Sequence, residues 1–414
     1  MIATGYGQRY SSGVRASRPV ARESTPTMKI VHTSDWHVGR RWKGIQRLDE
    51  LEAVLDHLAA FIEEQSIDLV LHTGDVFESR NPPAEAEQLV NRFLVRVGRA
   101  GAQMIVIAGN HDDPLRLDAR SLLTELVNVQ IVGRPRPAWR GGTRTIKTRH
   151  GETAVVAALP FASPGAWVSA LDLAGEEASA RSQYARMFER AVQDLCGAFR
   201  QDAVNLLMAH THLEGAIFGD SERRVHIGED WAASPESLPS TASYIALGHL
   251  HKPQQVDGPV PAYYAGSLLQ MDFGEAGEEK TFIVVTASPG KPANPSNIEH
   301  VPYEGGLPLV DLRATLAELE ETADDYRTGW LRVTVPLTEK DPDLNRKVRE
   351  LLPNALVVRA DLPEAEEPQD FRLETGVPPV GHYSAFHLRE HQHEADPVVL
   401  ETFQELYDQA TVED

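Results

Sequence analysis

The chain has 414 residues, of which 42% are hydrophobic and 24% charged, and its formal net charge is −21 at pH 7. The composition is ordinary for a soluble globular protein, and the length allows more than one domain with a large core in the first. The single cysteine, Cys196, excludes an intramolecular disulfide and a thiolate metal cage. No apolar stretch is long enough to cross a bilayer, and the acidic charge excludes simple electrostatic wrapping of nucleic acid by this chain alone. We therefore expect a cytoplasmic protein.

The first 27 residues carry scattered arginines among serine, glycine and proline, with no apolar periodicity. They lack the apolar middle section of a secretion signal, and Met28 begins the first expected strand directly. We predict a disordered leader over residues 1–27, which an upstream start codon in the reading frame would also explain. The alternative is a basic tail that contacts nucleic acid.

Residues 28–303 are predicted to form one large α/β domain. Apolar runs at 29–31, 68–71 and 104–107 indicate buried strands, and helical spacing of apolar residues follows each of them, at about 48–64, 84–97 and 115–126. This alternation favours a parallel sheet. Beyond residue 132 the pattern is richer in strands, with a long helix at about 176–200. We expect two sheets packed together with helices outside.

The remainder of the chain is predicted to contain a smaller unit and a tail. A strand–helix–strand pattern over residues 304–362 indicates a small α/β capping domain, and the acidic, proline-rich composition that follows predicts a linker over 363–396. Residues 397–414 predict an amphipathic helix with Leu400, Phe403 and Leu406 on one face. That helix either packs on the second domain or docks a partner.

Five clusters of polar, metal-binding residue types each follow a buried strand. They are Asp35-Trp36-His37, Gly74-Asp75, Gly109-Asn110-His111-Asp112, His210-Thr211-His212 and Gly248-His249-Leu250-His251. In an open α/β sheet, ligands gather outside the carboxyl ends of the strands. Carboxylate oxygens, an amide oxygen and imidazole nitrogens together form a donor set for divalent metals. The sequence therefore predicts a two-metal phosphoesterase.

The donor count suits phosphodiester hydrolysis. Two divalent ions about 3.5–4 Å apart lower the pKa of a shared water and neutralise phosphate charge. Such a pair needs few carboxylates, here Asp35 and Asp75, and several neutral donors, so that the site still accepts an anionic phosphate. Because strand side chains alternate, we expect residues two apart, as in Asp35 and His37, to point to the same place.

These motifs, in this order, resemble those of the calcineurin-like metallophosphoesterase superfamily. Two sequence motifs are similar to those of the SbcD family, the bacterial branch of the Mre nucleases. They are His32-Thr33-Ser34-Asp35-Trp36-His37-Val38-Gly39 and Gly74-Asp75-Val76-Phe77. The resemblance implies an α/β fold: a two-sheet metallophosphoesterase sandwich flanked by helices, with a smaller α/β capping domain and a C-terminal helix that docks a partner.

Residue roles follow from the resemblance. It implies one metal bound by Asp35, His37 and His251, a second bound by Asn110, His210 and His249, and Asp75 bridging the two. His111 would stabilise the transition state or protonate the leaving sugar oxygen. Two further residues have open roles. The Glu78 carboxylate is expected to orient His111 and raise its pKa, and Asp112 is either a helix N-cap or a support for the site.

Basic residues on the same loops are candidates for binding a phosphate backbone. They are Arg40, Arg41, Lys43, Arg80, Arg116 and Lys252. The alternative is that each is an ordinary solvated surface charge. Two other histidines, His72 and His212, are interpreted as structural or as supports behind the ligands.

The resemblance implies a manganese-dependent DNA nuclease subunit, with magnesium as the alternative metal. Such a protein acts as an exonuclease on duplex ends and as an endonuclease on hairpin or single-stranded DNA. It also implies a homodimer formed by the helices near 84–97 and 115–126, and assembly with an SbcC-type coiled-coil ABC ATPase. Two other functions stay open: a small-molecule phosphodiesterase acting on a nucleotide or cyclic nucleotide, and a non-catalytic scaffold that binds DNA ends.

Overall fold

The structure is a computed structural model that describes residues 27–162, 177–219, 232–363, 377–391 and 393–412. The predicted leader lies outside the described residues, apart from its last position. The chain divides into two compact units. One consists of Met1–Val335 and Asp343–Arg359, and the other of Pro336–Pro342 and Ala360–Asp414. Within the described part, no helix is long and apolar enough to span a membrane.

Two six-stranded sheets form the large domain. The first has the order β14 (Ile298–Pro302), β13 (Thr281–Ala287), β1 (Met28–Thr33), β4 (Leu69–His72), β5 (Gln103–Ile107) and β6 (Val129–Val132). The second has the order β11 (Gln254–Val256), β12 (Ala262–Tyr264), β10 (Tyr244–Gly248), β9 (Val204–His210), β8 (Thr153–Leu159) and β7 (Thr143–Lys147). Strands β1, β4, β5 and β6 run parallel, as do β8, β9 and β10. Their carboxyl ends therefore share one edge in each sheet.

The two sheets pack face to face on an apolar core. Ile30 and Leu71 of the first sheet lie in one buried cluster with Leu206 and Ala246 of the second. Val31, the neighbour of Ile30, belongs to a different cluster on the outer face, because successive strand side chains point to opposite faces.

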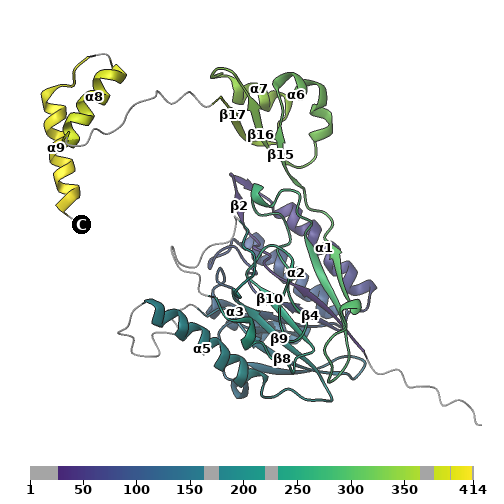
Figure 1. Ribbon diagram of the computed structural model, residues 1–414. Helices are drawn as coiled ribbons and strands as arrows, with labels where there is room; N and C mark the ends of the chain where they lie inside the picture. Colours follow the sequence, from purple (N-terminus) through teal and green to yellow (C-terminus); the bar gives the residue numbers. More distant parts are fainter. Residues whose placement is uncertain (1–26, 163–176, 220–231, 364–376, 392, 413–414) are drawn as a thin grey trace, which may run out of the picture. The chain divides into compact units, whose positions relative to one another are not determined.

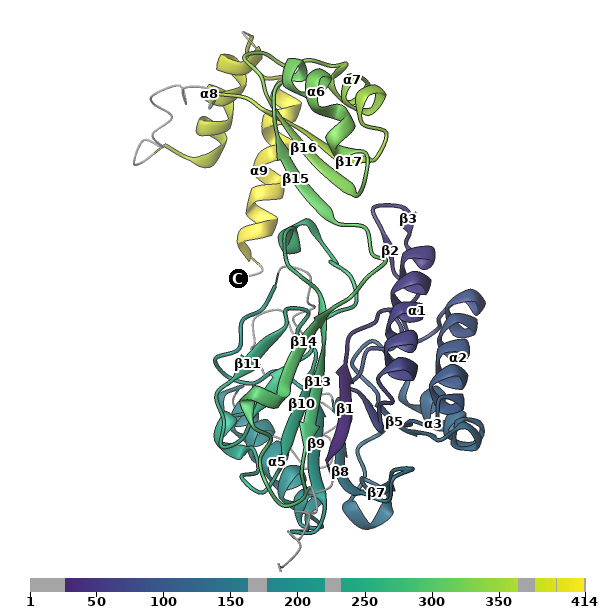
Figure 2. The same cartoon turned by 90° about the vertical axis from the view of Figure 1, so that its right-hand side faces the viewer.

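Helices cover both outer faces (Figure 1 and Figure 2). The helices α1 (Leu48–Glu64), α2 (Ala84–Arg99) and α3 (Pro114–Thr124) pack on the first sheet, and α5 (Glu177–Cys196) packs on the second. The expected two-sheet sandwich flanked by helices is thus confirmed. A short hairpin, β2 (Arg41–Trp42) and β3 (Ile45–Gln46), precedes α1.

A three-stranded sheet with two helices follows the sandwich. It contains β15 (Leu309–Arg313), α6 (Leu316–Thr322), β16 (Trp330–Pro336), α7 (Leu344–Leu351) and β17 (Ala355–Asp361). The buried Glu50 carboxylate of α1 joins this small sheet to the sandwich. The carboxylate accepts hydrogen bonds from Trp330 Nε1 at 2.9 Å and from Leu307 N at 2.8 Å. Arg47 pairs with the same carboxylate at 2.7 Å.

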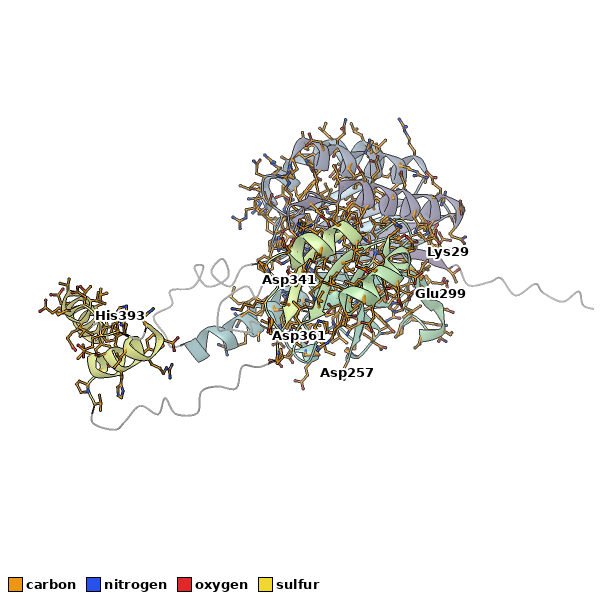
Figure 3. The ribbon with its side chains drawn as sticks, turned by 90° about the horizontal axis from the view of Figure 1, so that it is seen from above. Lys29, Asp257, Glu299, Asp341, Asp361 and His393 are labelled. Carbon is orange, nitrogen blue, oxygen red and sulfur yellow. The ribbon has the colours of Figure 1, made fainter. Side chains whose placement is uncertain are left out.

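The C-terminal unit contains a pair of helices, α8 (Pro379–His391) and α9 (Pro397–Val412). Tyr383 and Phe403 stack between them with ring centroids 4.5 Å apart. Figure 3 draws the side chains of the two helices and labels His393, which lies between α8 and α9 in the sequence. The prediction of a linker over 363–396 is wrong for residues 379–391. Helix α8 buries no side chain and has no strong apolar stripe, so its sequence carries little helical periodicity.

Candidate metal centre

The five predicted clusters come together at the carboxyl ends of five strands. Asp35 and His37 follow β1, Asp75 follows β4, Asn110 follows β5, His210 ends β9, and the pair at 249 and 251 follows β10. Because β1, β4 and β5 belong to one sheet and β9 and β10 to the other, the site lies where the ends of both sheets meet.

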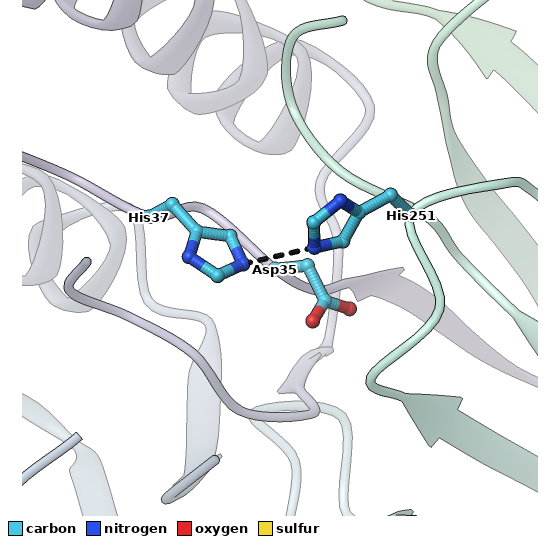
Figure 4. Close-up of side chains that lie close together, drawn as sticks. All are labelled: Asp35, His37 and His251. Carbon is cyan, nitrogen blue, oxygen red and sulfur yellow. Dashed lines mark hydrogen bonds between the residues drawn. The ribbon is translucent and has the colours of Figure 1, made fainter. Parts of the chain in front are cut away.

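One group of donors consists of Asp35, His37 and His251 (Figure 4). Their ligand atoms all lie within 4.8 Å of one another, and the Nε2 atoms of the two histidines are 3.1 Å apart. All three side chains are buried. Burial lowers the pKa of His37 to about 4, although the hydrogen bond to Glu78 opposes this. At neutral pH the ring is therefore uncharged and offers a lone pair to a cation.

The second group is built around the side-chain oxygen of Asn110. It lies 2.9 Å from His210 Nε2 and 3.0 Å from His249 Nδ1. The other ring nitrogen of His210, Nδ1, donates to the backbone oxygen of Thr73 at 2.7 Å. That bond fixes the proton on Nδ1, so the Nε2 lone pair faces the cluster.

Asp75 lies between the two groups. Its Oδ2 is 3.6 Å from His37 Nε2 and 3.6 Å from His210 Nε2, and its Oδ1 accepts the His111 amide at 2.8 Å. Burial alone would raise the pKa of Asp75, but the neighbouring histidines, His210 first, hold it well below its usual range. An ionised carboxylate in this position can bridge two cations. The donor set and its spacing thus fit the two divalent ions that the sequence predicts.

The backbone of the site is strained. Four predicted ligands have positive φ values: Asp35 (50°), His37 (48°), Asp75 (53°) and His249 (108°). Such conformations cost about 1–3 kcal/mol each and cluster at functional sites. The prediction that strand alternation points Asp35 and His37 to the same place is wrong, because residues 34–37 form a loop after β1. The left-handed turns, and not the two-residue period, bring Asp35 and His37 together.

Comparison with known proteins agrees with this geometry. The family model described as "Calcineurin-like phosphoesterase" matches residues 28–253, and one described as "Type 5 capsule protein repressor C-terminal domain" matches residues 306–378. The SbcD component of the nuclease SbcCD from Bacillus subtilis is 34% identical over 76% of this chain and 80% of its own length. The chain belongs to the SbcD family of calcineurin-like phosphoesterases.

Two further SbcD relatives extend the match. The protein of the same name from Escherichia coli K12 is 31% identical over 78% of this chain and 82% of its own length. The one from Rhodobacter capsulatus is 29% identical over 84% of this chain and 92% of its own length. The two family models cover the sandwich up to residue 253 and the capping domain from residue 306.

Close packing explains the motif glycines of this SbcD chain. A Cβ atom on Gly109 would lie 2.1 Å from Asp75 Oδ1 and 2.3 Å from Asp75 N, and one on Gly74 would lie 2.3 Å from His210 Nδ1. Only glycine allows the loop after β5 to approach the carboxylate so closely.

Glu78 contacts a different histidine from the one expected. Its carboxylate lies 2.9 Å from His37 Nδ1, whereas it is 3.9 Å from His111 Nδ1. His111 Nδ1 instead donates to the backbone oxygen of Glu78 at 2.8 Å. The expectation that the carboxylate orients His111 is therefore corrected: it orients His37, and the backbone orients His111. The His111 and His37 rings are 4.6 Å apart, so His111 borders the cluster.

Asp112 is not the cap of α3, and its hydrogen bonds match the alternative role, a support for the loops of the site. Its buried carboxylate accepts hydrogen bonds from the amides of Val76, Phe77 and Gly109 at 2.9–3.2 Å. It thereby joins the loop after β4 to the loop after β5. Burial and the nearby negative charge of Asp75 raise its pKa to about 7. The N-cap of α3 is Asp113, whose side chain accepts two backbone amides.

Two functional residues escaped the sequence analysis, Glu275 and Lys280. Glu275 Oε1 lies 3.5 Å from His251 Nδ1, and its other oxygen is 2.7 Å from Lys280 Nζ. Lys280 also donates to the backbone oxygen of His251 at 2.9 Å. Both are buried. A carboxylate behind a histidine ligand fixes its tautomer and raises its basicity. The clue in the sequence is weak: two charged residues beside a buried strand, far from any motif.

Three of the six predicted phosphate-binding cations already have acidic partners. Arg40 lies 3.6 Å from Glu78, Lys252 lies 3.7 Å from Glu278, and Arg116 is paired with Glu87 at 3.3 Å. The three other candidates are exposed: Arg41, Lys43 and Arg80. Arg116 thus braces α3 against α2 and is not freely available to DNA.

The two remaining histidines, His72 and His212, pack against aromatic side chains. His72 is fully buried, accepts the Gly74 amide at 3.2 Å and meets the Trp36 ring edge-on at 4.3 Å. His212 packs on Phe218 with ring centroids 4.1 Å apart. Neither belongs to the three groups of potential ligands among the described residues.

Proposed function

We propose that this SbcD-family chain is the metal-dependent DNA nuclease subunit of an SbcCD-like complex, acting in the cytoplasm. The observation that carries the proposal is the convergence of two buried donor groups around Asp75. The names of the relatives, nuclease subunits at 29–34% identity, support the nuclease activity.

Seven residues would hold two divalent ions, manganese in our proposal and magnesium as the alternative. Asp35, His37 and His251 form one site, Asn110, His210 and His249 the other, and Asp75 is shared. When bound, such a pair activates water and neutralises charge on the phosphate. In this proposal His111 would protonate the leaving sugar oxygen, which is supported by its position beside His37 and by the hydrogen bond of its ring to the Glu78 backbone oxygen.

The proposed substrates are duplex ends, for exonuclease cleavage, and hairpin or single-stranded DNA, for endonuclease cleavage. A small-molecule phosphodiesterase would not require the capping domain or the C-terminal helix pair, so these elements favour a large substrate or assembly. An idle scaffold is disfavoured because the set of donors is complete.

Digestion of end-labelled duplex and hairpin DNA with manganese tests the proposal. Wild type should degrade both, and His111→Ala should lose about 10²–10⁴-fold in rate, the usual contribution of general acid catalysis. Hydrolysis of bis-p-nitrophenyl phosphate with both DNAs intact would instead support the small-molecule enzyme. Because the nuclease could require its ATPase, the assay is run with and without that partner.

A homodimer and an ATPase partner complete the proposal. Three leucines around the end of α3 are strongly exposed: Leu122 (78%), Leu123 (72%) and Leu126 (82%). This apolar surface suits a second copy of the chain. In analytical ultracentrifugation, Leu122→Glu should shift dimer to monomer, and the control Ile217→Glu, at a loop residue 61% exposed, should not.

The helix pair α8–α9 is the proposed docking surface for the SbcC-type ATPase. Leu406 of α9 is 60% exposed, and Leu388 of α8 is 49% exposed. We expect Leu406→Glu to abolish co-elution with the ATPase and to leave hydrolysis of the small ester unchanged.

A further inference from the structure

A cavity of about 480 Å³ opens directly beside the candidate metal centre. Asn110, whose oxygen lies between His210 and His249, forms one wall. The volume is within the roughly 300–1,000 Å³ of pockets that enclose small molecules. The proposed chemistry at the metals uses none of the cavity's other lining residues.

The lining is mainly apolar, and its charged members are two arginines and the buried Asp112 carboxylate. Phe161, Met187, Pro114 and Pro135 line the interior, with two arginines, Arg80 and Arg134, among the other lining residues. A planar apolar group with a phosphate attached therefore matches this chemistry.

Hydrogen bonds and a ring contact hold two parts of the lining in place. Phe161 N donates to the backbone oxygen of Ala108 at 2.9 Å, and the Phe161 ring meets the His210 ring edge-on at 6.1 Å. Elsewhere in the lining, Asp118 accepts the Gly133 amide at 2.8 Å and pairs with Arg134 at 2.8 Å. A preformed wall costs little entropy when a ligand binds.

We propose that this pocket receives one unstacked nucleobase from the nucleotide next to the scissile phosphate. The inference rests on the proposed nuclease function, and it adds a base-binding subsite to that function. The base would stack on Phe161, which accepts any base because every base has a π face. Arg80 is exposed and forms no ion pair with the described residues, so its guanidinium is free to bind the adjacent phosphate.

A subsite of this kind has a consequence for the DNA that is cut. A base can enter only if it leaves its stack, which costs a few kcal/mol in duplex and least in unpaired DNA. Hairpin loops, single strands and frayed ends would therefore be the better substrates.

The experiment uses single-stranded oligonucleotides in which one abasic residue is moved position by position past the cleavage site. The full-length chain is assayed with manganese, alone and with the proposed ATPase partner. At one position next to the cleaved bond, the abasic residue should lower kcat/KM of wild type about tenfold, the usual effect of losing one stacked base. Phe161→Leu should lower kcat/KM on intact DNA similarly, and it should no longer respond to the abasic residue.

Matched variants separate the pocket from general damage. Phe199→Leu makes the same change at a half-buried ring beyond the far end of α5. Arg80→Ala should lower kcat/KM on intact DNA because it removes the contact with the adjacent phosphate, and Arg99→Ala, at an exposed arginine of α2, is its control. Both controls should cleave as wild type does, and manganese affinity by calorimetry should be equal in all variants. If no abasic position changes the rate of DNA cleavage, the proposed base-binding pocket is wrong and the proposed nuclease function is unaffected. If the small ester is hydrolysed but all DNA stays intact, the nuclease function fails and the pocket fails with it.

Discussion

The Glu275 carboxylate should set the affinity of the site for metal, although it would not touch the ion. Glu275→Gln keeps the shape of the side chain and removes its charge. The substitution weakens the contact with His251 Nδ1, which is 3.5 Å in length. His251 then becomes a less basic and less firmly oriented ligand.

The size of the effect follows from that distance. Losing a partner behind a metal ligand typically costs 10–100-fold in affinity. Because 3.5 Å exceeds the usual hydrogen-bond range, we expect the lower end, about tenfold or roughly 1.4 kcal/mol. Lys280 keeps a second carboxylate, Glu278, at 3.1 Å, so the fold should survive the change.

Calorimetric titration of manganese into the metal-free protein measures the effect. Glu278→Gln is the matched control, since Glu278 binds the same lysine and does not contact His251. We expect wild-type affinity in the control and a tenfold loss in Glu275→Gln. Equal losses in both variants would refute the reasoning, because the effect would then come from the charge of Lys280.

Three further predictions concern stability and the shape of the site. Glu50→Ala should destabilise the protein by about 3–5 kcal/mol in urea unfolding, since it strands a buried guanidinium, whereas Glu52→Ala, in an exposed pair, should cost at most about 1 kcal/mol. Gly109→Ala should abolish metal binding in calorimetry, because the new Cβ would overlap the Asp75 carboxylate; unchanged affinity would contradict the packing. Finally, burial raises the pKa of Glu275, but His251 and Lys280 together lower it further, so the net pKa lies below the ordinary value of 4.5. The ionised carboxylate therefore stabilises the fold above pH 4.5, and this contribution is lost as the pH falls below that value. In urea titrations, the difference in unfolding free energy between metal-free wild type and Glu275→Gln should stay constant from pH 7 to pH 5 and shrink from pH 5 to pH 3.

The fold was predictable where periodicity and burial coincide. The strands β4 and β9 are buried along their whole length and mainly apolar because both of their faces are covered, and helix α2 shows a clear apolar stripe. Helix α8 was missed for the opposite reason, since none of its side chains is buried. An apolar residue recurs at helical or strand spacing where one face of the element packs against the rest of the protein. A helix that buries no side chain therefore shows little apolar periodicity in its sequence.

The candidate site was predictable as a set of residues but not as a network. The loops that follow strands carry the donors in recognisable motifs, so Asp75 and Asn110 could be singled out. Hydrogen bonds between distant segments have no such spacing. The contact of Glu78 with His37, and that of Glu275 with His251, depend on how loops fold over the sheet ends. Positive φ values at His37 and His249 likewise escape any rule based on strand alternation.

The charge of the chain connects metal loading to DNA binding. Four buried or half-buried carboxylates surround the candidate centre: Asp35, Asp75, Glu78 and Glu275. Of the cations near it, Arg40 and Lys252 are engaged by carboxylates. Without metal, a phosphate entering this region would meet a negative field on a chain whose net charge is already −21. Two divalent ions would add four positive charges at that point. The binding of metal and the binding of DNA must therefore reinforce each other, and each raises the affinity for the other by the same factor.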